Sequence, residues 1–273
     1  MNSTARTWTY SHFRLGLKKY LNRNPGLLKF VRALRAIWVL GPWRAMLVKY
    51  HQRFNRNQPL PRNRHSLFPE LDVDATVQTL ERSGYSLGIQ VPDSQIEQIL
   101  QFCQSTNKRK LRNPHLMCDT IRQITHDPKI IGVASQYLGA EPVLYQTDLY
   151  WTLPPTDEQK HRRMVAQKSR FHYDVGDFRS LAVFVYLTDV TAECGPHVVI
   201  ESTHQKKSAW NLLSRFLTDQ VAEQKYGNRI KALTGQRGTG FFEDLTCYHK
   251  HSAGRAERLV LTITYMLQRT PLL

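Results

Sequence analysis

The spacing of apolar residues changes along the chain, from helical in the first half to strand-like in the second. Between residues 70 and 140 the apolar positions recur every three or four residues, which predicts helices. Residues 72–88 predict a short helix, a glycine turn and a strand. Residues 91–105 predict a helix capped by Asp93 or Ser94, and residues 127–139 a helix that Gly139 ends.

From residue 141 onward, β-branched and aromatic residues predict strands separated by Gly, Pro and polar turns. The strand at 180–190 is apolar on both faces, as expected of a strand that lies between two layers. One helical insert, 208–227, interrupts the series. The fold class predicted is mainly β with flanking helices, a sandwich or jelly roll. The other predicted strands cover 142–154, 197–202, 238–245 and 258–267.

The first 57 residues predict a separate, amphipathic helical extension. Leu28, Val31 and Leu34 share one helical face with Ile37 and Trp38, Gly41-Pro42 should end that helix, and Pro42 can open the next. Residues 58–69 predict a linker and residues 70–273 the main domain.

Charge separates the same two parts of the chain. Residues 1–69 hold 14 Lys and Arg and no acidic residue, whereas the remainder holds 24 basic and 22 acidic residues. The extension either packs on the body with solvated cations or offers a cationic surface to anionic lipid. Binding of nucleic acid is disfavoured, because the sequence contains no recognised nucleic-acid-binding module beside these basic residues.

The composition limits the cellular compartment and the class of protein that the sequence fits. Four scattered cysteines argue against a disulfide framework and a zinc ribbon and suit a reducing compartment. No stretch approaches the roughly 20 apolar residues of a membrane span. We expect a cytoplasmic protein, with a position peripheral to a membrane as one variant. Mitochondrial targeting is the lesser alternative, because the start is Arg-rich and lacks acids.

A His-x-Asp pair, His172 and Asp174, is the first candidate for chemistry. Two side chains that are two apart on a strand share a face and can bind one ion. An imidazole and a carboxylate suit Fe(II), but a third ligand is needed. The candidates are His197, His204, His249 and His251.

Arg258 follows His249 by nine residues, at the start of the last strand. His249 would complete two-His-one-carboxylate coordination, leaving positions for oxygen and a cosubstrate. The arginine would present a permanently charged fork to a carboxylate of that cosubstrate.

Three segments, 171–174, 181–208 and 238–265, resemble the phytanoyl-CoA dioxygenase family of non-haem iron, 2-oxoglutarate-dependent oxygenases, as do 83–100 and 127–145. The resemblance covers roughly residues 70–268 and implies a double-stranded β-helix of jelly-roll type. It implies His172, Asp174 and His249 as iron ligands and Arg258 as the partner of the distal carboxylate of 2-oxoglutarate. Where the family has a Gly-rich stretch after its last histidine, this chain has "HKHSAGRAER", so His251 stays an alternative to His249.

The resemblance implies an enzyme that uses Fe(II), 2-oxoglutarate and O2. The carboxylate at Asp174 favours hydroxylation, or a related desaturation, over halogenation. Gln146 is a further candidate for cosubstrate binding, Arg255 a rival for the carboxylate, and Trp151 and Tyr173 candidates for the pocket. The expected substrate is a small molecule or a lipid or acyl compound. The alternatives are an inactive jelly-roll binding protein and a membrane-surface scaffold.

Overall fold

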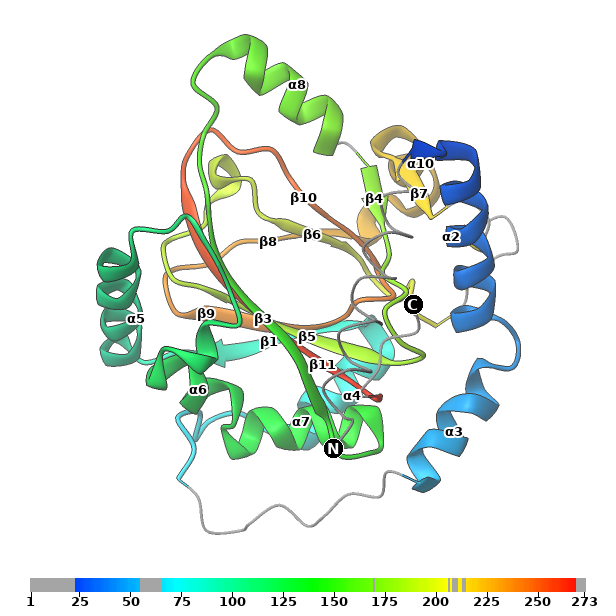
Figure 1. Ribbon diagram of the computed structural model, residues 1–273, viewed down its shortest axis with the longest axis horizontal. Coiled ribbons are helices and arrows are strands. Elements are labelled where there is room, and N and C mark those ends of the chain that lie inside the picture. Colours follow the sequence, from blue (N-terminus) through cyan, green and yellow to red (C-terminus); the bar gives the residue numbers. More distant parts are fainter. Residues whose placement is uncertain are drawn as a thin grey trace, which may run out of the picture.

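The computed structural model describes residues 23–54, 65–168, 170–205, 207, 211–212 and 215–268. Two antiparallel sheets face each other, and helices cover the outside of the larger sheet (Figure 1). The larger sheet has the order β1-β9-β5-β11-β3-β2, and the smaller one has the order β7-β4-β10-β6-β8. This is the arrangement expected of a double-stranded β-helix, with helices before the strands.

The longest strands, β3 with ten residues and β11 with nine, lie side by side in the larger sheet. That sheet contains β1 (Tyr85–Gln90), β2 (Lys110–Arg112), β3 (Val143–Thr152), β5 (Ser180–Tyr186), β9 (Thr239–Asp244) and β11 (Arg258–Met266). The smaller sheet contains β4 (Arg170–His172), β6 (His197–Ile200), β7 (Phe216–Thr218), β8 (Ile230–Leu233) and β10 (Tyr248–His251).

Three predicted helices of the body, α4, α5 and α7, are present, together with others that the sequence did not indicate. Gly84 and Gly139 end α4 and α7 with φ of 83° and 69°, where a residue with a side chain would be strained. The residue that caps α5 is Pro92 and not Asp93 or Ser94. The helices of the body are α4 (Val73–Ser83), α5 (Asp93–Thr106), α6 (Asp119–Thr125), α7 (Pro128–Leu138), α8 (Glu158–Lys168) and α10 (Asp219–Tyr226), with short 3-10 turns at Pro114–Leu116, Ala192–Cys194 and Gly227–Arg229.

The insert predicted as one helix at 208–227 is different in the structure. Its described part begins a short helical turn at residues 211–212, then forms strand β7 and helix α10. The strand forms because β4 offers an edge with which β7 can pair, and Phe216 lies opposite His172 of β4. Tertiary pairing therefore overrides the local pattern.

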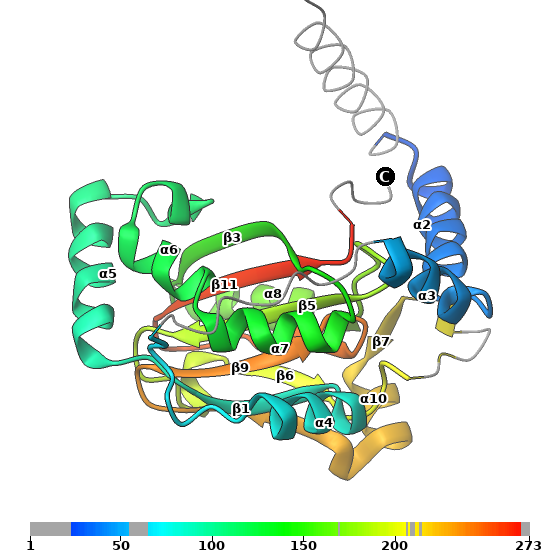
Figure 2. The same cartoon turned by 90° about the horizontal axis from the view of Figure 1, so that it is seen from below.

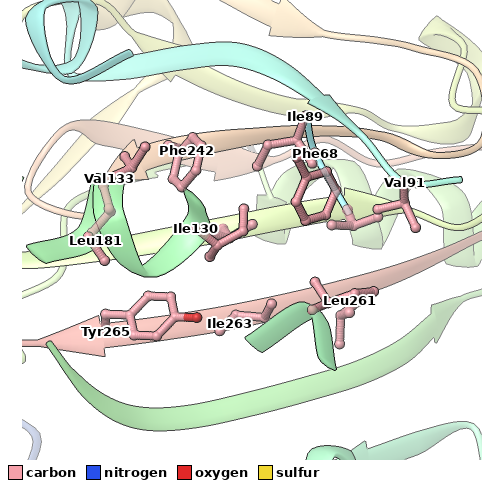
Figure 3. Packing of buried hydrophobic residues seen from close by; sticks show 14 of the residues in the cluster. Phe68, Ile89, Val91, Ile130, Val133, Leu181, Phe242, Leu261, Ile263 and Tyr265 are labelled. Atoms are coloured by element: carbon pink, nitrogen blue, oxygen red, sulfur yellow. The ribbon is translucent and has the colours of Figure 1, made fainter. Parts of the chain in front are cut away.

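The alternate residues of β5 belong to two different cores, which explains why this strand is apolar on both faces. Leu181 and Val183 pack with the helices outside the larger sheet, whereas Ala182 and Phe184 face the space between the sheets. Figure 3 shows Ile130 of α7 in the outer core, among residues of the neighbouring strands. The helices thus leave the inner face of the larger sheet available for a cavity.

The N-terminal helices α2 (Pro25–Leu40) and α3 (Arg44–Phe54) lie against the body on the side of β4 and β7 (Figures 1 and 2). Gly41 ends α2 as predicted, but α3 begins at Arg44 and not at Pro42. Ala36 and Val39 are fully buried in a cluster with Phe171 and Tyr173. The extension therefore packs directly on the strand that carries His172. The predicted linker, 58–69, lies largely outside the described residues.

Among the described residues, no helix is both long enough and apolar enough to cross a membrane.

Candidate metal centre and its cavity

His172, Asp174 and His249 come together at the ends of two paired strands. His172 of β4 lies directly opposite His249 of β10 in the antiparallel register. Each of the three residues offers one ligand atom, and these atoms lie within 4.8 Å of one another. Metal–ligand bonds of about 2.0–2.2 Å place two donors on one ion at most roughly 4.4 Å apart. A small contraction of the side chains would therefore let all three bind one ion.

Asp174 reaches this position from a loop and not from a strand, which corrects the sequence prediction. Strand β4 ends at His172. Beyond it the Asp174 N–H donates to the carbonyl of Leu245 at 2.8 Å, which fixes the loop next to the centre. A guanidinium nitrogen of Arg215 lies 3.6 Å from the Asp174 carboxylate. Asp174 is therefore held by one backbone contact and one ion pair.

A buried carboxylate, Glu243 of β9, orients His249. Nδ1 of His249 lies 3.1 Å from the Cys247 carbonyl and 3.2 Å from Glu243. Both of these oxygens only accept, so Nδ1 carries the proton and Nε2 is left for a metal. Glu243 also lies 2.5 Å from Nε2 of His197. Sequence reasoning missed Glu243, because its acidic side chain is an ordinary feature of a strand sequence.

The pKa values of this cluster follow from burial and from Glu243. Burial disfavours the charged form of His249, but the Glu243 carboxylate outweighs it and raises the pKa of His249 to about 9. Burial and the neighbouring His249 lower the pKa of His172 to about 4. In the metal-free protein, His249 therefore carries the positive charge that compensates the buried Glu243.

Arg258 is a buried cation at the start of β11. It is 1% exposed, and one guanidinium nitrogen lies 3.3 Å from Nδ1 of His251. Its Nε and Nη1 atoms have no hydrogen-bonding partner in the described part of the chain. Buried charges normally have such partners. The orphaned N–H groups therefore suit an anionic ligand that enters the space between the sheets.

A cavity of about 770 Å³ opens beside the three candidate ligands. The metal candidates lie on its β4 and β10 side, and strands β3, β5 and β11 of the larger sheet form the opposite wall. Gln146 and Trp151 line it. The Gln146 amide donates to the Asp148 carboxylate. Tyr173 does not line it and instead is buried in the core, where its hydroxyl donates to the Asn211 carbonyl at 2.8 Å.

The other candidate residues have different surroundings. His251 also lines the cavity but contacts Arg258, and His197 lies against Glu243. His204 lies 3.6 Å from Cys247. Arg255, the rival for the cosubstrate carboxylate, is exposed and pairs with Glu158 of α8 at 3.0 Å. Of the candidate third ligands, His249 is the one placed beside His172 and Asp174.

Comparison with known proteins gives the fold and no closer relationship. No family model matches the chain, and no curated protein matches it. A solved structure of EctD from S. alaskensis, with 2-oxoglutarate and 5-hydroxyectoine, matches with a TM-score of 0.53 and 16% identity over 77% of this chain and 81% of that one. SnoN, a non-haem α-ketoglutarate-dependent epimerase from nogalamycin biosynthesis, matches with a TM-score of 0.53 and 16% identity over 71% and 80%.

A second SnoN structure, a complex with Fe3+, α-ketoglutarate and a nogalamycin compound, matches with a TM-score of 0.52 and 15% identity over 71% of this chain and 83% of that one. The chain therefore has the fold of the iron- and 2-oxoglutarate-dependent oxygenases. The resemblance to the phytanoyl-CoA dioxygenase type predicted from the sequence holds at the level of this fold.

Proposed function

We propose that this protein is a non-haem Fe(II)- and 2-oxoglutarate-dependent dioxygenase that hydroxylates a small-molecule, lipid or acyl-type substrate. One observation carries the proposal: a His-Asp-His set opens onto a cavity, and His251 of the cavity lining contacts Arg258, a buried arginine with orphaned N–H groups. The three clustered metal donors favour this proposal over an inactive binding protein of the same fold.

The donor set fits Fe(II), because two imidazoles and one carboxylate on one side of an ion form the arrangement typical of such oxygenases. When bound, the iron and 2-oxoglutarate supply the oxidising chemistry. His172, Asp174 and His249 would occupy the side of the ion toward β4 and β10. The side toward the cavity would stay available to cosubstrate, oxygen and substrate. The carboxylate at Asp174 occupies the position that a halide would need, which favours hydroxylation or desaturation over halogenation.

Arg258, Gln146 and the apolar wall of the cavity would bind the cosubstrate and exclude water. Arg258 would hold the distal carboxylate of 2-oxoglutarate through Nε and Nη1, with His251 orienting the guanidinium from its other side. Ala182 and Phe184 present an apolar wall to the cavity. Gln146 lines the same wall, and we propose that it contacts the cosubstrate there.

The test compares iron content and 2-oxoglutarate affinity of the wild type with His172→Ala and Arg258→Ala. We expect the first variant to lose iron and the second to keep iron but lose 2-oxoglutarate affinity. His126→Ala and Arg237→Ala are the matched controls, because both side chains are exposed and lie outside the cavity lining. A wild type that takes up no iron and does not decarboxylate 2-oxoglutarate would instead support the binding-protein alternative.

A second proposal concerns an exposed apolar stripe on α2. Its five residues follow helical spacing on the face opposite the buried Ala36: Leu27 (41% exposed), Phe30 (60%), Val31 (37%), Leu34 (50%) and Trp38 (50%). The surrounding chain is cationic and lacks acids up to Glu70. We propose that residues 1–57 bind the surface of anionic membranes and that the protein is cytoplasmic and peripheral, with mitochondrial targeting as the alternative.

Point variants test this proposal better than truncation, because α2 packs on Tyr173 next to the metal candidates. We expect Phe30→Ser combined with Leu34→Ser to abolish co-sedimentation with phosphatidylserine vesicles. Leu116→Ser with Met117→Ser is the control, since both side chains are exposed elsewhere. Equal binding by the two double variants would contradict the proposal, as would equal binding to neutral vesicles.

A further inference from the structure

One basic side chain, Lys207, lies behind the candidate metal centre and outside the lining of its cavity. Its Nζ atom donates to the carbonyl of Thr203 and, at 2.6 Å, to the carbonyl of Thr246. The same atom lies 4.7 Å from the centre of the Tyr173 ring and 4.6 Å from the centre of the Tyr248 ring. In the described part of the chain, the ammonium therefore contacts two carbonyls and two aromatic rings and forms no ion pair.

The two tyrosines are the chain neighbours of the three candidate ligands. Tyr173 lies between His172 and Asp174 in the sequence. Tyr248 immediately precedes His249. Both rings are fully buried in the cluster that α2 covers, whereas the ligands line the cavity on the other side of the smaller sheet. The two rings also meet edge to face, with their centres 5.2 Å apart. A contact that holds both rings therefore holds the backbone that carries all three ligands.

The two carbonyls extend this link to the loops beside the centre. Thr246 directly follows Leu245, whose carbonyl accepts from the N–H of Asp174 at 2.8 Å. The hydroxyl of Thr203 accepts from the N–H of Tyr248, at the start of β10, at 2.9 Å. One ammonium therefore connects the loop that fixes Asp174 with the turn that fixes β10.

A charge at this place costs free energy, and packing does not require one. Burial lowers the pKa of Lys207 to about 8; Cys247 and Asp244 oppose this shift, and the charge of Arg44 adds to it. A methionine would fill a similar volume without the cost of taking an ammonium out of water. It could not donate to the carbonyls or attract the two ring faces, and both of these interactions are stronger away from water. The lysine therefore contributes directed contacts and not only volume.

We propose that Lys207 is a positioning residue of the metal centre. The inference rests on the proposed function, because it takes His172, Asp174 and His249 as the ligands. Lys207 acts through the two tyrosine rings and the Thr246 carbonyl, since its contacts are with residues next to the ligands. The three donor atoms lie within 4.8 Å of one another and must come slightly closer to bind one ion. The ammonium limits how far the loop of Asp174 and strand β10 can separate, which keeps the donors near the spacing that one ion needs.

Calorimetric titration of the full-length chain with Mn2+ at pH 7 tests the proposal. Lys207→Met removes the charge and both donated bonds but keeps the length of the side chain. We expect it to weaken Mn2+ binding about tenfold, at the lower end of the effect of residues that hold metal ligands in place. Lys207→Arg keeps the charge and the donors, so its affinity should stay within about threefold of the wild type. The electron paramagnetic resonance spectrum of bound Mn2+ reports the geometry of its ligands; it should change in Lys207→Met and match the wild type in Lys207→Arg.

Tyr265→Phe is the matched control for stability. It removes the bond from the buried Tyr265 hydroxyl to the Thr125 carbonyl, 2.6 Å long, in the outer core. We expect it to lower the midpoint of thermal unfolding without changing the affinity for Mn2+ or the spectrum. Lys207→Gln keeps a donor group but loses the charge, and it should weaken Mn2+ binding at least about fivefold. This second variant decides the question if Lys207→Met does not fold.

The outcomes separate this inference from the proposed function. Wild-type affinity and an unchanged spectrum in Lys207→Met or Lys207→Gln would overturn the positioning role alone. An equal loss of affinity in Tyr265→Phe would also overturn it, because affinity would then only follow stability. A wild type that binds no Mn2+ would instead refute the metal centre and with it the proposed function.

Discussion

The contact between Glu243 and His249 makes metal affinity depend on pH in a defined way. In the metal-free protein the Glu243 carboxylate holds the pKa of His249 at about 9, although burial opposes this. Below pH 9, His249 therefore carries two ring protons, and binding a metal through Nε2 must release one of them. His172 releases none, because burial and His249 lower its pKa to about 4.

The loss of metal affinity depends on how far the assay pH lies below this pKa. Each pH unit below 9 should weaken the apparent metal affinity about tenfold, so that affinity rises with pH up to 9. At pH 7 the competing proton weakens metal binding about a hundredfold, on the order of 3 kcal/mol. In Glu243→Gln the Cys247 carbonyl still accepts from Nδ1 of His249, but the charge that raised the pKa is gone. Burial then lowers the pKa, and the pH dependence should disappear.

Calorimetric titration with Mn2+ measures this effect without oxidation of the metal. Titrations at pH 6, 7 and 8, each in two buffers of different ionisation enthalpy, give both the affinity and the number of protons released. We expect about one proton per metal ion for the wild type at pH 7 and about none for Glu243→Gln. A wild type that releases no proton, with a flat affinity between pH 6 and 8, would refute the assigned role of Glu243.

Three further variants address individual residues. His249→Ala should abolish metal uptake and His251→Ala should retain it, as metal analysis of the purified proteins will show; loss of metal in both would leave the third ligand unassigned. Gln146→Leu should weaken 2-oxoglutarate binding about two- to fivefold by calorimetry, and an unchanged affinity would remove this residue from the cosubstrate site. Asp177 accepts from the backbone N–H groups of residues 178, 267 and 268 at 2.7–2.9 Å, so Asp177→Ala should lower the free energy of unfolding by about 3 kcal/mol in urea titrations. The exposed control Asp119→Ala should cost less than about 1 kcal/mol, and equal losses would contradict this reading.

Much of the body could be predicted because local patterns there agree with the tertiary structure. Gly84 and Gly139 end helices in a left-handed conformation, and the continuous apolar run at β5 indicates a strand with both faces covered. The prediction of one helix at 208–227 was wrong, because the helical pattern of this insert competes with pairing to an unpaired strand edge. Propensity gives way when such an edge offers backbone hydrogen bonds.

The sequence alone indicated helices followed by strands and the pair His172 and Asp174. It favoured His249 but left His251 open, because residues two apart on one strand project from the same face. The strand register places His249, and not His251, opposite His172. Only the tertiary structure brought Glu243 to His249 and Arg35 to the cavity, across sequence separations that no local pattern records. Local periodicity therefore specifies which face a residue occupies, and strand pairing and packing specify what that face meets.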